Sequence, residues 1–224
     1  MKAMILAAGR GKRMRPLTDH TPKPLLEAGG KPLIVWHIER LAQAGFRELV
    51  INIAHLGEQI EARLGDGSDW GVDIAYSREP DGALETGGGV RQALGLLGRG
   101  AFAVVNGDVW TEYPLARLPR EPEGLAYVVL IDNPPHHSEG DFFLERGRLR
   151  HRSADAASGR LTFSGIGVYR PELFAAHAAG RFPLAPLLRA HFDRGLIGGE
   201  HYRGPWLDIG TPERLEALDR RLRR

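Results

Sequence analysis

The sequence predicts an α/β fold: a single domain built on a central mixed, mainly parallel sheet flanked by helices. Short apolar runs of strand length alternate with segments of helical periodicity in the first 110 residues, as in a β-α-β-α progression. Two of these runs end in segments rich in glycine or charge, where open α/β sheets bind ligands. The 224 residues are enough for one domain with a sizeable core.

The composition indicates a cytoplasmic protein without disulfides. Thirty Lys and Arg against 28 Asp and Glu give a net charge of +2, so nucleic acid is not the expected partner. The absence of Cys excludes disulfides, thiolate metal sites and a cysteine nucleophile. The first apolar run carries Lys2 and soon reaches Gly9, so neither a signal peptide nor a membrane span is expected.

The first expected element is a buried strand over residues 1–8, and a basic loop follows it. Gly9 and Gly11 permit close approach of a ligand to the backbone, because they have no side chain. Four positive charges fall within the next six residues, at Arg10, Lys12, Arg13 and Arg15. A strand, a flexible basic turn and a later lysine are typical of a phosphate-binding cradle.

Two common phosphate-binding motifs do not fit this loop. A dinucleotide-binding fingerprint needs a third glycine where Met14 stands, and a Walker A loop needs four residues between its glycines and Ser or Thr after the lysine. Here one residue separates Gly9 from Gly11, and Arg13 follows Lys12. A solvated basic face or a nucleic-acid patch remains the alternative.

The elements that follow alternate between strand and helix. Residues 24–31 are expected to form a short strand that ends in a Gly-Gly turn, and Pro32 opens a helix that Gly45 ends. The pattern then predicts a strand, a helix and a strand over residues 47–53, 58–64 and 72–77.

Two segments before residue 110 are candidate ligand contacts. Three glycines precede an expected helix over residues 90–97, whose start presents free N–H groups; a loose linker is the alternative. A buried strand over residues 101–105 ends in Asn106, Gly107 and Asp108. Asp108 is either a ligand-binding carboxylate at a strand end or an ordinary turn residue.

The second half of the chain is less regular. Strands are expected over residues 124–131 and 161–169, with a hairpin over residues 140–149 between them. Helices are expected over residues 171–179 and 184–194, and the last helix has Thr211 as N-cap and Pro212 at its first position.

His136 and His137 stand together in a loop after the strand that ends near residue 131. Adjacent side chains point apart on extended backbone, and no third ligand occurs at helical spacing. We therefore interpret both histidines as loop residues rather than metal ligands.

Two strings carry a family resemblance. The string L-A-A-G-x-G-x-R-M-x-P-L-T with the later T-P-K-P-L resembles the signature of the sugar-1-phosphate nucleotidylyltransferases. The string W-x-D-x-G-T-P around Asp208 resembles the second metal motif of that family. The resemblance implies a Rossmann-like, GT-A-like nucleotidyltransferase fold and transfer of a nucleotidyl group from a nucleoside triphosphate to a sugar 1-phosphate.

The resemblance also implies roles for particular residues. The catalytic group would be Arg15 and Lys23, which hold phosphates, with Asp108 and Asp208, which bind Mg²⁺. The nucleotide would be bound by Leu6, Ala7, Ala8, Gly9, Gly11, Lys12, Arg13, Thr86, Gly87 and Gly88. The sugar would be bound by Asn106, Gly140, Asp141, Ser164 and Gly165. The nucleotide-binding part would then cover about residues 1–110 and the sugar-binding part about 111–210.

Several strings are most similar to those of members that use UTP and N-acetylmuramic acid 1-phosphate in peptidoglycan recycling, so the resemblance implies these two substrates. A mannose- or glucose-1-phosphate nucleotidylyltransferase is the alternative within the family. A nucleotide-binding regulatory module without turnover is the alternative of another class. We expect a monomer or a weak homo-oligomer, without the hexapeptide-repeat domain that several members carry.

The chain departs from the family pattern at one place. Many members have a Glu-Lys-Pro segment after the hairpin, whose lysine contacts the sugar phosphate. Here Arg146 follows Glu145, and no lysine occurs after Lys31. Binding of the sugar phosphate would then rely on Lys23, the metal ion, or an arginine such as Arg146 or Arg148.

Overall fold

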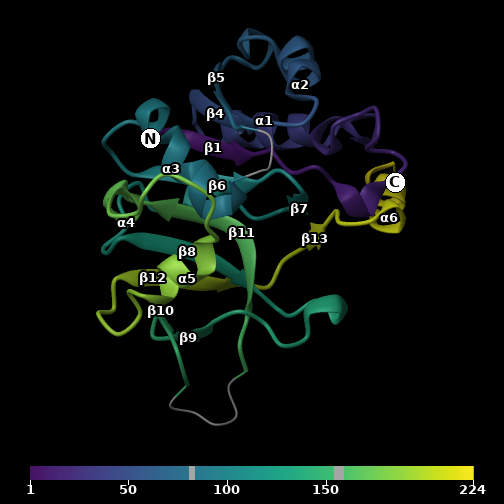
Figure 1. Ribbon diagram of the computed structural model, residues 1–224. Helices are drawn as coiled ribbons and strands as arrows, with labels where there is room; N and C mark the ends of the chain where they lie inside the picture. Colours follow the sequence, from purple (N-terminus) through teal and green to yellow (C-terminus); the bar gives the residue numbers. More distant parts are fainter. Residues whose placement is uncertain (81–83, 154–158, 224) are drawn as a thin grey trace.

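The structure is a computed structural model that describes residues 1–80, 84–153 and 159–223. Within these residues, a nine-stranded sheet runs in the order β5-β4-β1-β6-β11-β8-β12-β10-β9, with helices packed on both faces (Figure 1). This is the α/β fold with a central mixed sheet that the sequence predicts.

The amino-terminal half of the sheet is parallel. Its strands are β1 (Ala3–Leu6), β4 (Glu48–Ile53), β5 (Asp73–Arg78) and β6 (Phe102–Asn106). β1 pairs with both β4 and β6, and β4 pairs with β5. The carboxyl ends of these strands therefore meet at one edge of the sheet, together with the loops that follow them.

The other half of the sheet mixes strand directions. β8 (Ala126–Ile131) runs parallel to β12 (Ile197–Tyr202), and the hairpin of β9 (Phe143–Glu145) and β10 (Arg148–Arg150) continues the sheet beyond β12. β11 (Thr162–Tyr169) lies antiparallel between β6 and β8. β11 thus joins the two halves into one sheet.

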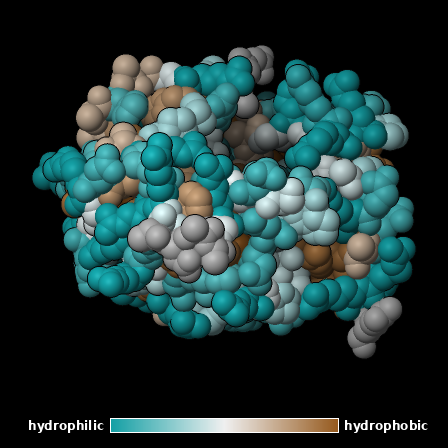
Figure 2. All heavy atoms as spheres, turned by 90° about the horizontal axis from the view of Figure 1, so that it is seen from below, coloured by the Kyte–Doolittle hydropathy of each residue, from teal (hydrophilic) through white to brown (hydrophobic). Residues whose placement is uncertain are grey.

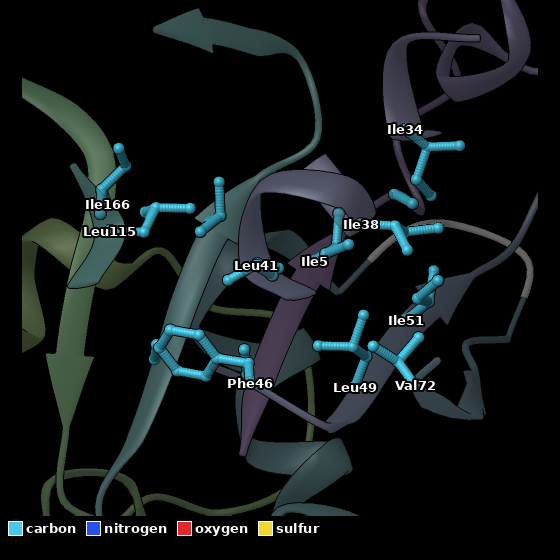
Figure 3. Packing of buried hydrophobic residues seen from close by; sticks show 14 of the residues in the cluster. Ile5, Ile34, Ile38, Leu41, Phe46, Leu49, Ile51, Val72, Leu115 and Ile166 are labelled. Atoms are coloured by element: carbon cyan, nitrogen blue, oxygen red, sulfur yellow. The ribbon is translucent and has the colours of Figure 1, made fainter. Parts of the chain in front are cut away.

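Two helices cover one face of the sheet. α1 (Leu33–Gln43) and α2 (Gly57–Leu64) pack there against strand residues that point to this face. The alternate residues of each strand point to the opposite face. Figure 3 shows Ile5 of β1, Leu49 of β4, and Ile38 and Leu41 of α1 gathered in this cluster.

Three helices cover the opposite face. They are α3 (Glu85–Leu97), α4 (Glu172–Ala175) and α5 (Leu184–Arg189). Val90, Phe174 and Leu188 from these helices share a buried cluster with Met4 of β1 and Val104 of β6. The sheet is therefore the middle of three layers.

A third cluster brings the two ends of the chain together. α6 (Pro212–Leu222) buries Leu215 and Leu218 with Met14 and Ile209. Two small sheets accompany this cluster: β2 (Glu27–Ala28) with β3 (Lys31–Pro32), and β7 (Val109–Thr111) with β13 (Trp206–Asp208). The last helix and the basic loop near the amino terminus are therefore parts of one packed unit.

Some expected elements have other bounds in the structure. Residues 24–31 are not one strand: the chain first makes a 3₁₀ turn, Lys23–Leu25, and the Gly-Gly turn then joins β2 to β3. Both glycines of that turn have positive φ, 63° and 80°, which reverses the chain. The helix expected over residues 90–97 begins at Glu85, so the three glycines lie inside it.

The helices expected over residues 171–179 and 184–194 are shorter. They end at Ala175 and Arg189. The side chains from 175 to 181 are exposed. A short helix without an apolar face to bury gains little from continuing, which accounts for the end of α4. α5 ends at Arg189 although Phe192 beyond it is buried.

Figure 2 shows the molecule from below, with hydrophilic residues over most of this face and hydrophobic residues only in small separate areas. Such scattered apolar exposure is usual for a protein surface. Among the described residues, none of the helices combines the length and the hydrophobicity needed to span a bilayer.

Candidate active site

A cavity of about 350 Å³ opens where β1 and β6 end. This volume falls in the range of small-molecule sites, about 300–1,000 Å³. Many residues that the sequence singled out line it: Leu6, Ala7, Ala8, Gly9, Gly11, Lys12, Arg13, Lys23, Thr86, Asn106 and Asp108. Seven other lining residues were not among the predicted site residues: Met14, Pro24, Asn52, Glu79, Glu85, Gly107 and Gly210.

The basic loop after β1 has a defined backbone. Gly11 has φ +60°, and a Cβ there would lie 2.9 Å from Thr18 Cγ2, so both conformation and space favour glycine. Met14 N donates to Gly11 O at 2.8 Å and closes the 3₁₀ turn η1 (Lys12–Met14). Lys12 and Arg13 line the cavity from this turn.

Arg13 lines the cavity, whereas Arg15 does not. Arg15 Nε lies 3.1 Å from Asp19 Oδ1, and its side chain is 60% exposed. Between the two arginines, the side chain of Met14 is fully buried in the third cluster. The chain leaves η1 in extended conformation at Arg15, which carries this arginine away from the cavity.

Lys23 and Asp108 form an ion pair at the cavity, with Nζ 2.8 Å from Oδ2. The side chain of Lys23 is 10% exposed, so burial of its stem and the carboxylate fix the position of its ammonium group. Asp108 is 44% exposed and lies in the turn after β6. The ammonium group therefore has a fixed position at the cavity wall.

The backbone segments of the two candidate metal ligands come together through β7 and β13, and of the two residues Asp108 lines the cavity whereas Asp208 does not. Asp208 pairs in register with Val109, and Ile209 N donates to Asp108 O at 2.7 Å. Two oxygen-bearing carboxylates fit Mg²⁺, which commonly uses one or two protein carboxylates and takes its other ligands from water and phosphates. In the described part of the chain, no group of three His, Cys, Asp or Glu side chains is arranged to hold a metal ion.

Asp208 is surrounded by basic side chains. Its Oδ1 lies 2.9 Å from His136 Nε2, and its Oδ2 pairs with Arg214. Arg13 also lies close to the segment that carries Asp208. Its Nη1 is 3.3 Å from the position that a Cβ on Gly210 would take. His136 belongs to the loop after β8, as expected, but the structure brings this loop residue to a candidate metal ligand.

Gly87 and Gly88, in the first turns of α3, pack against another part of the chain. A Cβ on Gly87 would lie 2.5 Å from the ring of Phe182, and one on Gly88 would lie 2.2 Å from Gly180 O. Both are buried, and neither lines the cavity, whereas Thr86 does. These two glycines allow close packing of α3 against residues 180–182. Their contact with a nucleotide stays a prediction.

The candidate sugar-binding residues are divided between the cavity and its support. Asn106 lines the cavity, and Gly165, with φ +82°, packs against it: a Cβ there would lie 2.7 Å from Asn106 Cγ. Ser164 O accepts a hydrogen bond from Trp206 Nε1 at 2.9 Å. Gly140 and Asp141 lie in the loop that carries His136 and do not line the cavity.

The structure does not bring Arg146 or Arg148 to this cavity. Arg146 occupies the turn of the β9–β10 hairpin with φ +47°, and Arg148 pairs with Glu123. This hairpin is the far end of the sheet from β5. Neither arginine that the sequence offers in place of the absent lysine therefore lies at the cavity.

A buried polar pair links the basic loop to the start of α3. Ala7 N donates to Asn52 Oδ1 at 2.7 Å, and Asn52 Nδ2 donates to Glu79 Oε1 at 2.6 Å. Glu79 Oε2 accepts from Leu84 N at 2.8 Å. The one sequence signal for this pair is an asparagine between Ile51 and Ile53, within a run that is otherwise apolar from Leu49 onward.

His37 of α1 is buried close to Asp108. Burial lowers its pKa from the usual 6.5 to about 4, and the charge of Arg40 acts in the same direction. The charge of Asp108 and hydrogen bonds to the backbone of Val109 and Gly107 oppose this shift. His37 is therefore neutral at pH 7 and supports the turn that carries Asp108.

Comparison with known proteins gives consistent results. The family model described as nucleotidyl transferase matches residues 2–142. The chain is 54% identical to the N-acetylmuramate alpha-1-phosphate uridylyltransferase of Neisseria meningitidis, over 96% of both chains. It is 35% identical to the protein of the same name from Caulobacter vibrioides, over 98% of this chain and 96% of the relative.

Solved structures share the fold at low sequence identity. The crystal structure of a Bacillus anthracis protein in complex with sucrose has a TM-score of 0.86 and 22% identity, over 100% of this chain and 95% of that one. The inositol-1-phosphate CTP transferase of T. maritima has a TM-score of 0.78 and 18% identity, over 99% of this chain and 95% of that one.

Proposed function

The chain belongs to the nucleotidyl transferase family, and we propose that it transfers the uridylyl group of UTP to N-acetylmuramic acid 1-phosphate. The products are UDP-N-acetylmuramic acid and pyrophosphate. The observation that carries this proposal is the 54% identity to the Neisseria uridylyltransferase over 96% of both chains. The reaction would serve the recycling of peptidoglycan sugars.

The reaction brings two anions together. An oxygen of the acceptor phosphate attacks the α-phosphorus of UTP, and the bond from that phosphorus to the pyrophosphate oxygen breaks. Two like charges at about 4 Å repel by roughly 4 kcal/mol at an effective dielectric of 20. The acceptor phosphate is already ionised, so the site needs fixed positive charge more than it needs a general base.

The basic residues at the cavity meet this requirement. Lys23, held by its pair with Asp108, lies at the end of β6 and contacts phosphate oxygens of the bound substrates. Lys12 and Arg13 act on the triphosphate from the turn of the basic loop. In this proposal Arg13 takes the phosphate-binding role for which the resemblance nominates Arg15, because Arg13 lines the cavity.

Asp108 and Asp208 would hold Mg²⁺. When bound, this ion neutralises phosphate charge and acts as a Lewis acid on phosphoryl oxygens. The backbone contact between Ile209 N and Asp108 O keeps the two carboxylate-bearing segments next to each other. Asn106 contacts the acceptor from the cavity wall, with Gly165 packed behind it.

A pyrophosphate-release screen tests the proposal. UTP, CTP, GTP and TTP are each paired with the 1-phosphates of N-acetylmuramic acid, glucose and mannose in the presence of Mg²⁺. We expect the highest kcat/KM for UTP with N-acetylmuramic acid 1-phosphate, and Asp108→Asn as a control should release almost no pyrophosphate. A preference for GTP and mannose 1-phosphate would assign the chain to another branch of the family. Release from no pair, with nucleotide binding intact, would indicate a regulatory module.

A further inference from the structure

The loop between β8 and β9 is tied at its base by Asn133. Asn133 Nδ2 donates to Ser138 O at 2.9 Å and to Arg160 O at 3.0 Å, and its Oδ1 accepts from Thr162 Oγ1 at 2.8 Å. One side chain thus joins the loop to itself and to the start of β11. These hydrogen bonds therefore fix the loop to the sheet.

Asp141 makes a second tie at the other end of this loop. Its Oδ2 accepts from Phe163 N at 2.8 Å, and its Oδ1 lies 3.1 Å from His137 Nε2. Gly140 has φ +60°, and a Cβ there would lie 2.7 Å from Asn133 Oδ1, so the turn between the ties is tightly packed. The described contacts of Asp141 therefore shape the loop.

This tied loop carries His136 to Asp208. His136 Nε2 lies 2.9 Å from Asp208 Oδ1, at a distance where an Nε2–H can donate. Arg214 of α6 contacts the other oxygen, Oδ2. One donor from the β8–β9 loop and one from α6 thus contact the two oxygens of this carboxylate. Together they fix the orientation of the Asp208 side chain.

We propose that His136 is the positioning residue for Asp208. This inference rests on the proposed function, in which Asp208 binds Mg²⁺. A carboxylate has about four lone-pair sites, so Asp208 keeps the contacts to His136 and Arg214 and still presents oxygen lone pairs to an ion. Partners of this kind orient metal ligands, and their loss typically costs 10- to 100-fold in metal affinity or activity.

The proposal also explains why a Pro-Pro-His-His segment stands at this point of the chain. Pro134 and Pro135 restrict the backbone just before His136. His137 uses its ring for the tie to Asp141, which leaves His136 to reach β13. The loop of residues 133–141 therefore brings His136 to the proposed metal ligand.

The test compares His136→Ala and His136→Gln with the wild-type protein. His136→Ala should raise the Mg²⁺ concentration needed for half-maximal turnover 10- to 100-fold, with the KM for UTP little changed at saturating Mg²⁺. His136→Gln should recover much of the loss, because its amide Nε2 can donate where the imidazole Nε2 did. Binding of Mn²⁺ in the presence of UTP, followed by electron paramagnetic resonance, should weaken in parallel without requiring turnover.

A matched control is available within the chain. His201 Nε2 lies 2.9 Å from Asp132 Oδ1, which repeats the same type of pair away from the cavity. His201→Ala should leave the Mg²⁺ requirement and Mn²⁺ binding at their wild-type values. Thermal unfolding of all variants identifies any general loss of structure.

Three outcomes separate the possibilities. Weakened Mn²⁺ binding in Asp208→Ala but unchanged binding in His136→Ala overturns the proposal while Asp208 remains a ligand. A raised KM for the sugar phosphate alone in His136→Ala also overturns it, because His136 would then act on the acceptor. Unchanged Mn²⁺ binding in Asp208→Ala shows that the metal assignment itself is wrong, whichever substrates the wild-type protein uses.

Discussion

Single side chains at the cavity have positions that their neighbours determine. Lys23 has most of its side chain buried and is held by Asp108, and His37 is buried behind the same aspartate. A fixed cation stabilises developing charge without a cost of ordering, whereas a buried neutral histidine makes stability depend on pH. Both residues can be tested by substitution.

Lys23→Ala should lower kcat about 10²- to 10³-fold and raise the KM for UTP, because a fixed cation beside the phosphates acts on the bound and transition states alike. Lys23→Arg should restore little, since a broad guanidinium fork does not replace a compact ammonium group in a buried position. Steady-state kinetics at saturating acceptor measures both variants, with circular dichroism as a control for folding. Full activity in Lys23→Arg would mean that the residue supplies only general positive charge.

The stability of the folded protein should decrease as the pH is lowered, because His37 titrates at a lower pH in the folded protein than in the unfolded chain. Its pKa is about 4 in the folded protein against 6.5 ordinarily, so the unfolded chain binds a proton first as the pH falls. The contribution is therefore fully present above pH 6.5 and is lost as the pH falls toward 4, with a slope of up to about 1.4 kcal/mol per pH unit.

Urea unfolding at several pH values between 7 and 4 measures this slope. His37→Gln should lose the part of this slope that one proton contributes, because glutamine does not titrate. Parallel pH profiles for wild type and His37→Gln would contradict the assignment.

At the scale of elements, close packing around the first turns of α3 determines which residues can stand there. Gly87, Gly88 and Gly89 lie in its first turns, where residues 180–182 and the pair of Asn52 and Glu79 leave no space for side chains. A Cβ on Gly89 would lie 2.5 Å from Glu79 Oε1. The close approach brings Thr86 and Glu85 to the cavity.

Gly88→Ala and Gly95→Ala form a matched pair in this helix. A Cβ at residue 88 meets the backbone oxygen of Gly180 at 2.2 Å, so the first variant should be destabilised by about 1–3 kcal/mol or more. Gly95 is exposed and has nothing within 4 Å of the added atom, so the second variant should gain about 0.5–1 kcal/mol. Urea unfolding compares them, and equal effects of the two changes would contradict the packing role.

At the scale of the whole molecule, the third cluster connects distant parts of the chain around the site. Met14 belongs to the basic loop, Ile209 follows Asp208, and Leu218 lies on α6. Asp219 Oδ1 also accepts a hydrogen bond from Gly29 N at 2.8 Å. The last helix therefore supports both the loop that contacts the triphosphate in our proposal and the strand that carries Asp208.

Leu218→Ala should destabilise the protein by about 2–5 kcal/mol, because Leu218 is fully buried. It should also raise the KM for UTP, since Met14 shares the cluster and the basic loop would lose part of its support. Leu96→Ala is the control: this residue is 39% exposed, and its change should stay within about 0.5 kcal/mol. A large loss of stability with an unchanged KM would show that the loop does not depend on α6.

The sequence by itself determined the α/β class, the order of the main strands and helices, and the family. Apolar periodicity marks β1, β4, β6 and α1 because each pattern depends on neighbours within a few residues. The motifs also led to Lys23 and Asp108, which the structure brings into contact.

Only the tertiary structure decided how distant segments meet. β7 and β13 have three residues each, too few to give a periodic signal, yet their pairing brings Asp208 beside Asp108. The contact of His136 with Asp208 likewise depends on a loop and a strand far apart in the chain. Local sequence patterns report local conformation, whereas these contacts arise from packing and hydrogen bonding between segments that meet only in the folded chain.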